Sequence, residues 1–378
     1  MKICKFHRIL TIPALCAAAL LVVPITGSAT ESSEQQCSRV EFSACLNGVS
    51  SSVTNGPGLR VSSSELDEVA RERSGSSSAS ASGGTASLFK RETTLAAGDE
   101  MGGSVFGMWV NYSYSDFDSD FAFRGTSLAY DGDAHNVTAG IDRLFGGRFL
   151  IGVAGGYQFM DTDTDFNGGG QENDGFTIAP YAAVLINDYF SIDVMGGYSS
   201  LEYDQDRISP TDGTDIRADF DADRWFVATN FNALYTVSNW VFGGRIGYLH
   251  TDEEQDDYLE TGSAASAAAG RLRTVQERNI DLSQMIVSAD VGYTFGNFEP
   301  YVMAAFHEDV GRNDDNGAGG LPGNFTSVQP DDDDEWQFNV GIRHYTDWGA
   351  TMSFEYSRVE GRQAFDSDTF MFTVRAAL

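Results

Sequence analysis

The feature that most constrains the fold is a strict two-residue alternation of bulky apolar side chains with small or polar ones. In Phe149 to Phe159, the bulky residues at 149, 151, 153, 157 and 159 share one face, and Gly152, Ala154, Gly156 and Gln158 lie on the other. The same alternation runs through Trp336 to Ile342 and through Phe370 to Leu378. A period of two places successive side chains on opposite faces of a β-sheet. The chain is therefore expected to form a large all-β domain.

The length of these segments distinguishes a membrane barrel from a soluble sandwich, in which strands also alternate. The segments run for about 10 to 14 residues, whereas strands of soluble proteins have roughly 5 to 6. Aromatic residues often stand near their ends, as in the girdles of a membrane barrel, and the small residues of the other face suit a narrow lumen. We place twelve strands near residues 104–115, 134–145, 149–160, 174–186, 189–203, 222–237, 240–251, 281–295, 298–309, 335–346, 350–360 and 368–378.

The connections between these segments alternate between short and long, which is typical of outer-membrane barrels. An even number of strands in a closed meander also leaves no unpaired edge in lipid. The pattern predicts a twelve-stranded antiparallel transmembrane β-barrel of up-and-down topology, with its short turns facing the periplasm. The short turns lie at 146–148, 187–188, 238–239, 296–297 and 347–349, and the long acidic loops at 116–133, 161–173, 204–221, 252–280, 310–334 and 361–367.

Two segments precede the predicted barrel domain, residues 104–378. Residues 1–29 combine a basic start, an apolar stretch and small residues before Ala29, which predicts a secretory signal peptide. Residues 30–103 are rich in Ser, Gly and charge, and they predict a mostly disordered linker or short passenger. Because export leads to an oxidising compartment, we expect a disulfide between Cys37 and Cys45.

The composition excludes several functions. The formal net charge is −31, from 24 Lys and Arg against 55 Asp and Glu, which argues against nucleic acid as a partner. The sequence has no common catalytic or nucleotide-binding motif and no Cys/His spacing for zinc. His250 with Asp252, or His307 with Glu308 and Asp309, could act as an acid/base pair, but strand-end histidines beside acidic loops are the commoner case. We therefore expect no enzyme activity, cofactor or metal site.

Seven charged residues fall on the small-residue face of the predicted strands and should point into the lumen. Charges of both signs in a barrel lumen can pair for stability, line a channel or hold a threaded segment. Pairing for stability is the simplest of these interpretations. The predicted lumen-facing charges are Asp142, Asp193, Asp290, Glu355, Arg245, Arg343 and Arg375.

The predicted long loops carry most of the acidic residues. Asp161, Asp163 and Asp165 could collect divalent cations through oxygen ligands, as could the run from Asp331 to Asp334, but neither has the spacing of an EF-hand. A solvated acidic surface, bridged by divalent cations to lipopolysaccharide, is the favoured interpretation. The expected partners are thus outer-membrane lipid, lipopolysaccharide and the barrel-assembly machinery, and the barrel is expected to be a monomer.

The stretch from Gly107 to Phe166 resembles the opening of an autotransporter translocator domain. That family begins with a Trp-bearing strand and an Asp- and Gly-rich loop, followed by a G-x-D strand and a strand rich in Gly, Ala and Tyr. Trp109, Gly140 to Asp142 and Gly152 to Tyr157 match these elements in order. The resemblance covers Ser104 to the C-terminus, and it implies a twelve-stranded barrel with both ends in the periplasm.

The sequence departs from that family at three points. Family members usually carry a passenger of hundreds of residues, whereas only residues 30–103 are available here. Members that cleave themselves use an Asn pair before the first strand, and no Asn occurs between Pro57 and Met108. The last residue is Leu378 rather than an aromatic, although Phe370 and Phe372 keep the aromatic alternation.

Two functions follow from the sequence. The first is an autotransporter-like outer-membrane barrel that anchors, exports or displays its short N-terminal segment. The alternative is a passive porin-like or structural barrel with no secreted passenger.

Overall fold

The computed structural model describes residues 105–377 except for residues 121, 124–125, 128, 147, 166, 188, 316–333 and 362–364. The predicted signal peptide, the segment 30–103 and the Cys37–Cys45 pair lie outside the described residues.

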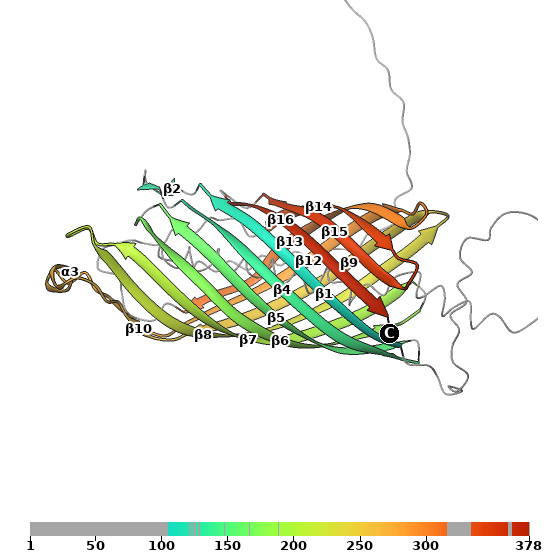
Figure 1. Ribbon diagram of the computed structural model, residues 1–378, viewed down its shortest axis with the longest axis horizontal. Helices are drawn as coiled ribbons and strands as arrows, with labels where there is room; N and C mark the ends of the chain where they lie inside the picture. The colour runs from blue at the N-terminus through green and yellow to red at the C-terminus, as the bar shows by residue number, and fades with distance from the viewer. Residues whose placement is uncertain are drawn as a thin grey trace, which may run out of the picture.

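Twelve long antiparallel strands form one closed barrel, which confirms the predicted fold (Figure 1). Each strand pairs with its neighbours along the chain, and the first and last strands, β1 and β16, pair to close the barrel. The strands are β1 Val105–Ser119, β4 Tyr130–Phe145, β5 Phe149–Thr164, β6 Gly169–Leu185, β7 Phe190–Ile208, β8 Asp215–Val237, β9 Trp240–Gln255, β12 Arg278–Tyr293, β13 Phe298–Asp315, β14 Asp334–Tyr345, β15 Ala350–Glu360 and β16 Phe365–Ala377.

The strands end where predicted at the short turns but continue further on the loop side. β7 extends to Ile208 and β8 begins at Asp215, so most of the predicted loop 204–221 is strand. The predicted loop 161–173 is likewise mostly strand. These loop assignments were wrong because the outward-facing residues beyond the membrane are acidic, so apolar alternation fades although cross-strand pairing continues.

Residues 256–277 also fold, although the sequence predicted an acidic loop there. They form β10 (Tyr258–Leu259), α3 (Ala264–Ala268) and β11 (Thr274–Val275), which we call the cap hairpin. The rings of Tyr203, Phe220 and Tyr258 stack with centroids 4.9 and 4.6 Å apart. A second short hairpin pairs β2 (Ala122–Phe123) with β3 (Thr126–Ser127).

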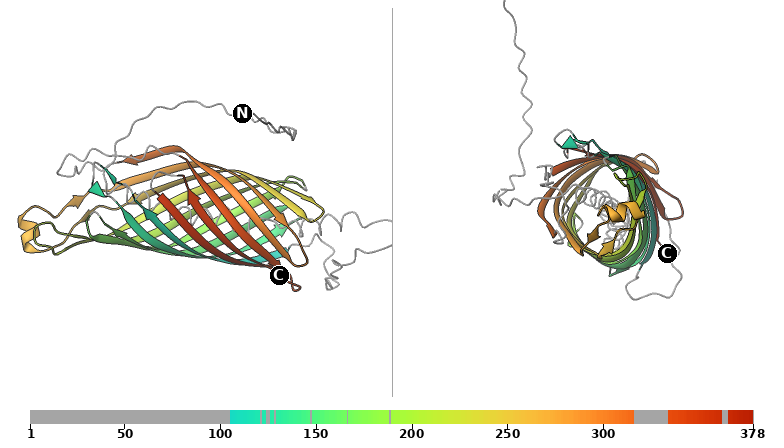
Figure 2. Two further views of the ribbon diagram at one scale, coloured as in Figure 1. Left: turned by 90° about the horizontal axis from the view of Figure 1, so that it is seen from above. Right: turned by 90° about the vertical axis from the view of Figure 1, so that its left-hand side faces the viewer.

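Ionic and polar contacts attach the cap hairpin to the extended ends of β7 and β8. Arg207 donates two hydrogen bonds to Glu260, of 2.8 and 2.6 Å, and both side chains are largely buried. Seen along the barrel from the loop end, α3 lies in front of the barrel opening (Figure 2). Within the described residues, no helix is long and apolar enough to cross a membrane.

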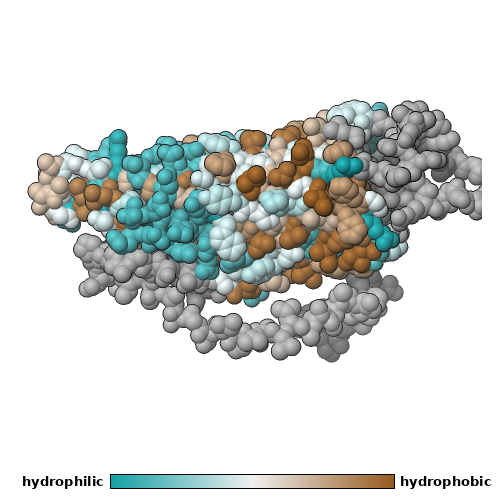
Figure 3. All heavy atoms as spheres, turned by 90° about the horizontal axis from the view of Figure 1, so that it is seen from below, coloured by the Kyte–Doolittle hydropathy of each residue, from teal (hydrophilic) through white to brown (hydrophobic). Residues whose placement is uncertain are grey.

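The outer wall of the barrel carries an apolar belt nearer the short turns and a hydrophilic surface nearer the cap hairpin (Figure 3). Exposed side chains such as Ile141, Ile151 and Phe176 belong to the belt. From Phe149 to Phe159 the outward side chains are exposed and almost all apolar. Ten residues at about 3.4 Å each, tilted by roughly 40°, span ~26 Å along the barrel axis. This height matches the apolar band of outer-membrane barrels.

Hydrogen bonds between aromatic and acidic side chains mark the loop-side edge of the belt. The Tyr157 hydroxyl donates to Asp174 over 2.6 Å, and the Tyr198 hydroxyl donates to Asp223 over 2.5 Å. Such rings place an apolar body in lipid and a polar tip in water. The chain beyond this edge therefore lies outside the hydrocarbon layer.

Candidate functional site

The lumen wall is the candidate functional site, because the alternation places a distinct set of side chains on it. In β1 the inward residues include Asn111, Ser113 and Ser115, all almost completely buried, whereas the outward Val110 and Tyr112 are exposed. The pleat of a strand produces this separation. The inner face of the barrel can therefore form hydrogen bonds, whereas the outer face of the same strands is apolar.

Inward-facing glycines allow aromatic rings to lie against the wall. A Cβ atom on Gly140 would lie 2.5 Å from the Trp109 ring, and one on Gly152 would lie 2.4 Å from the Tyr181 ring. Contacts this short do not occur between real atoms, so a side chain at either position would force the neighbouring ring to move. The rings occupy the space above the glycines instead of projecting across the lumen.

A hydrogen-bonded chain links four strands near the short turns. Arg375 donates two hydrogen bonds to Asp142, of 2.9 and 2.8 Å. The Tyr181 hydroxyl donates to Asp142 over 2.7 Å and accepts a hydrogen bond of 2.8 Å from Trp109 Nε1. Two of the seven predicted lumen charges thus form a buried ion pair.

A second cluster surrounds Asp193 on β7. The side-chain amides of Asn230 and Asn232 donate to its two oxygens over 2.7 and 2.6 Å. Arg245 Nε donates to the amide oxygen of Asn232 over 3.1 Å, so the predicted charges Asp193 and Arg245 lie in one network. Hydrogen bonds of this kind satisfy a buried carboxylate.

A third cluster joins β13, β14 and β15. Arg343 donates a hydrogen bond to Glu299, and its guanidinium lies 3.8 Å from the centre of the Tyr301 ring. The Tyr301 hydroxyl and the Asn339 amide both donate to Glu355, over 2.5 and 2.8 Å. Asp290, the seventh predicted charge, is half-buried on β12 next to Gly243.

Several buried charges of the lumen escaped the sequence analysis. Arg224 and Glu253 form an ion pair of 2.6 Å, and His307 lies 3.6 Å from Glu335. Glu299 is also buried, on the same inward face of β13 as Tyr301. These residues could have been located by counting every second position from a known inward residue, whereas the polarity of the side chains did not reveal them.

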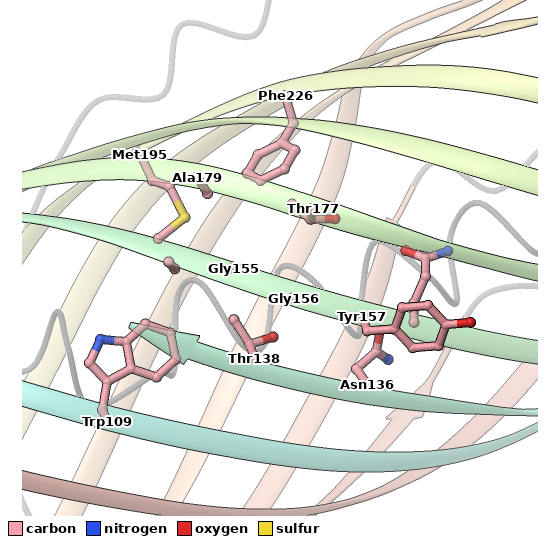
Figure 4. A pocket seen from close by; sticks show the side chains of 12 residues that line it. Trp109, Asn136, Thr138, Gly155, Gly156, Tyr157, Thr177, Ala179, Met195 and Phe226 are labelled. Atoms are coloured by element: carbon pink, nitrogen blue, oxygen red, sulfur yellow. The ribbon is translucent and has the colours of Figure 1, made fainter. Parts of the chain in front are cut away.

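A small pocket lies in the lumen wall over β5 and its neighbours (Figure 4). Trp109, Met195 and Phe226 supply apolar sides, and Thr138 and Thr177 supply hydroxyl groups. Gly156 leaves the floor free of side chains. The lining of this pocket thus combines apolar and hydrogen-bonding groups.

Of the acids that the sequence paired with the histidines, Glu308 lies on the opposite face of β13 from His307, whereas Asp252 lies on the same face of β9 as His250. His250 contacts Ser283 over 2.9 Å, while Asp252 accepts a hydrogen bond from Trp225. His307 is buried, whereas Glu308 is exposed on the other face of β13. Among the described residues, no group of three His, Cys, Asp or Glu could hold a metal ion.

The predicted cation-collecting acids that the structure describes lie on the outside of the barrel. Asp161 and Asp163 are exposed on β5, beyond the loop-side edge of the belt, and Asp165 is exposed in the following turn. Of the run from Asp331 to Asp334, only the last residue is described, as the first of β14. These acids line the outer rim and not the lumen.

Comparisons with known proteins identify the type of domain. The sequence model of the family "Autotransporter beta-domain" matches residues 108–357, which is more than half of the chain. No curated protein matches the sequence.

Solved structures show the same fold. The translocator domain of autotransporter NalP from Neisseria meningitidis is similar with a TM-score of 0.58 and 11% identity, over 73% of this chain and 90% of that one. The beta domain of the Bordetella autotransporter Brka is similar with a TM-score of 0.54 and 14% identity, over 72% of this chain and 100% of that one.

Proposed function

The chain belongs to the autotransporter beta-domain family, and from this premise we propose that the barrel carries its own N-terminal segment, residues 30–103, through its lumen and displays or anchors it. The barrel itself is an outer-membrane translocator barrel of the Gram-negative type. Its family is one of transport domains rather than enzymes.

The proposal is carried by the position at which β1 begins and by the polar side chains on the inner face of this strand. β1 begins at Val105, at the end of the barrel that holds the short turns and the C-terminus (Figure 1). If those turns face the periplasm, residues before Val105 can reach the cell surface only through the lumen. The inward side chains of β1 that line this route are polar and buried, including Asn111 and Ser113.

The length of the chain permits this route. Residues 74–103 contain 103 − 74 + 1 = 30 residues. An extended chain advances about 3.3 Å per residue, so roughly ten residues cross a hydrocarbon layer of about 30 Å. Residues 74–103 can therefore cross the membrane while residues 30–73 lie outside.

The proposed surroundings of the barrel follow from its outer wall. The apolar belt would contact membrane lipid, and the acidic rim would contact lipopolysaccharide through divalent cations. We also propose that the barrel-assembly machinery inserts the barrel into the membrane and that the barrel functions as a monomer. The predicted signal peptide, residues 1–29, would direct the chain across the inner membrane.

Locating the segment in whole cells tests the proposal. An epitope tag after Thr54 should bind antibody on intact cells, and added protease should remove it. The matched control is the same tag in the short turn 238–239, which should be reached only after the outer membrane is broken. If the tag after Thr54 becomes accessible only in broken cells, the proposal is wrong and the passive porin-like barrel is the function that remains.

A further inference from the structure

An arginine, Arg143, lies inside the apolar belt of the outer wall. It follows Asp142 on β4, and because Asp142 is buried on the lumen side, the side chain of Arg143 points outwards. Its direct cross-strand partners are Phe106 on β1 and Ile151 on β5, which are 49% and 58% exposed on the same face. Among the outward residues that the structure describes between the short turns and the tyrosines of the loop-side edge, Arg143 alone carries a permanent charge.

Arg143 lies one row inside the edge of the belt that is next to the short turns. The following outward pair, Phe145 with Phe149, is the last before the chain turns from β4 into β5. Two residues at about 3.4 Å each, tilted by roughly 40°, place the backbone of Arg143 ~5 Å inside this last row. A long arginine side chain covers such a distance and brings its charged end to the headgroup layer.

Two aromatic rings hold the charged end of this side chain at the edge of the belt. The central guanidinium carbon of Arg143 lies 4.7 Å from the centre of the Phe106 ring and 5.0 Å from the centre of the Phe145 ring. Since Phe145 stands nearer the turn than Arg143, the second contact shows that the side chain leans towards the short turns. Cation–π contacts of this kind fix the position of a cation and leave its charge in place.

A positioned cation at this level of a membrane suits the phosphate group of a lipid. A charge on the lipid face is costly unless it reaches the headgroup layer or meets an opposite charge. Glycerophospholipids carry a phosphate at that level, and a planar guanidinium can donate two parallel hydrogen bonds to it. The exposed side chains of Ile141 and Ile151 flank Arg143 on the same face and would lie against the acyl chains.

We propose that Arg143, together with Phe106 and Phe145, forms a binding site for the phosphate of one phospholipid on the outer wall of β1, β4 and β5. The ligand class is a glycerophospholipid of the leaflet at the short-turn end, which is the periplasmic leaflet in the proposed orientation. The site goes beyond the proposed function, because it requires a barrel in a membrane and not the passage of residues 30–103 through the lumen.

Native mass spectrometry of the full mature chain in neutral detergent tests the site, with phosphatidylglycerol as the probe. Arg143→Gln should lower the affinity for this lipid by about tenfold, because hydrogen bonds to a charged group are lost. Arg148→Gln is the matched control, since it removes the same charge from an exposed residue of the adjoining turn, and it should keep the affinity of the unchanged protein. The shift in migration between unheated and heated gels confirms that both variants are folded barrels.

Two further probes separate the phosphate from the other parts of the lipid. Diacylglycerol has acyl chains but no phosphate, so it should bind equally to the unchanged protein and to Arg143→Gln. Inorganic phosphate at millimolar concentration should not displace phosphatidylglycerol, because it makes no contact with the apolar belt.

A double variant tests the two rings. Phe106→Leu combined with Phe145→Leu keeps the belt apolar but removes both cation–π contacts, so the affinity for phosphatidylglycerol should fall several-fold. An unchanged affinity in this variant would overturn the part that the rings play in the site.

Four other results would overturn the phospholipid site. An equal affinity of the unchanged protein and Arg143→Gln would show that Arg143 binds no phosphate, and an equal loss in Arg148→Gln would show a general attraction between charges. A matching loss of diacylglycerol binding would show apolar contact alone, and displacement by inorganic phosphate would show a site for the free ion. Each of these results leaves the epitope-tag test after Thr54 unaffected, so the proposed function stands or fails separately.

Discussion

Arg375 on the last strand and Asp142 on β4 form a bidentate ion pair that passes over Gly107 of the first strand. A Cβ atom on Gly107 would lie 2.4 Å from an Asp142 oxygen and 2.7 Å from an Arg375 nitrogen. Because β1 lies between β16 and β4, the pair spans the seam at which the barrel closes. The absence of a side chain at residue 107 is what allows this contact.

Replacing Gly107 by valine should separate Asp142 from Arg375. Removing a partner from a buried ion pair costs about 3–5 kcal/mol, and both side chains are largely buried here. The free energy of unfolding, measured in urea and detergent micelles, should fall by a similar amount. Arg358→Ala is the control, because its ion pair with Asp368 is partly exposed and worth at most ~1 kcal/mol. An equal fall in the free energy of unfolding of Gly107→Val and Arg358→Ala would contradict the role of Gly107 in the Asp142–Arg375 ion pair.

Gly197 on β7 and Gly155 on β5 should respond differently to valine. A Cβ on Gly197 would lie 2.2 Å from the Phe226 ring, inside the lumen, whereas the nearest atom to a Cβ on Gly155 lies 3.8 Å away on the lipid side. Gly197→Val should destabilise the barrel by about 1–3 kcal/mol through overpacking, and Gly155→Val should have almost no effect. The thermal unfolding of each variant in micelles measures the difference. Loss of stability in Gly155→Val alone would refute the inward and outward assignment.

The cap hairpin should resist protease, unlike an acidic loop without structure. Tyr258 contributes a buried aromatic ring to the cap hairpin. Tyr258→Ala should therefore destabilise the folded hairpin by about 3 kcal/mol. The open form would then be populated about a hundredfold more, which raises the rate of tryptic cleavage after Arg271. Leu259→Ala is the matched control, because that side chain is 64% exposed. Rapid cleavage of the unchanged protein after Arg271 would show that the hairpin is not packed.

The acidic rim should become more stable at mildly acidic pH. Partial desolvation raises the pKa of Asp161, and the negative charges of Glu172 and Asp163 raise it further. A raised carboxyl pKa means that the folded state binds a proton more readily than the unfolded state. Stability is therefore gained as the pH falls through the raised pKa towards the ordinary value of about 4, and it is lost as the pH rises.

Asp161→Asn tests this pH dependence. At pH 7 the variant should unfold at a higher urea concentration than the unchanged protein, because it carries no charge at this position. Its own gain in stability between pH 7 and pH 5 should be smaller. An identical pH dependence of stability in the two proteins would mean that the protonation of Asp161 does not contribute to the gain in stability at lower pH.

The sequence predicted the fold where lipid imposes one apolar face. Phe149 and Ile151 had to face outwards, and turn residues such as Gly296 interrupted the pattern where the strands end. Beyond the membrane the strands continue, and Ile216, Ala218 and Phe220 still alternate with charged residues. That inward alternation was present in the sequence, but the acidic outward positions made the region look like a loop.

The sequence assigned seven charged residues to the small-residue face, but it missed others such as Arg224 and Glu253, and it could not predict the partners of any of them. Asp142 and Arg375 are 233 residues apart, and they meet only because the barrel closes in a particular register. The same applies to Tyr301 and Glu355, which belong to strands separated by β14. A single sequence fixes the face of each strand and leaves the register between distant strands open.

Single-channel conductance in planar bilayers tests the central claim, that the lumen holds the N-terminal segment, most directly. The full mature chain is compared with a variant that lacks residues 74–103 and with a control that lacks the equally long stretch 30–59. The account predicts a markedly higher conductance for the first deletion and no change for the second. Equal conductance in all three proteins would contradict it and leave an open, passive barrel.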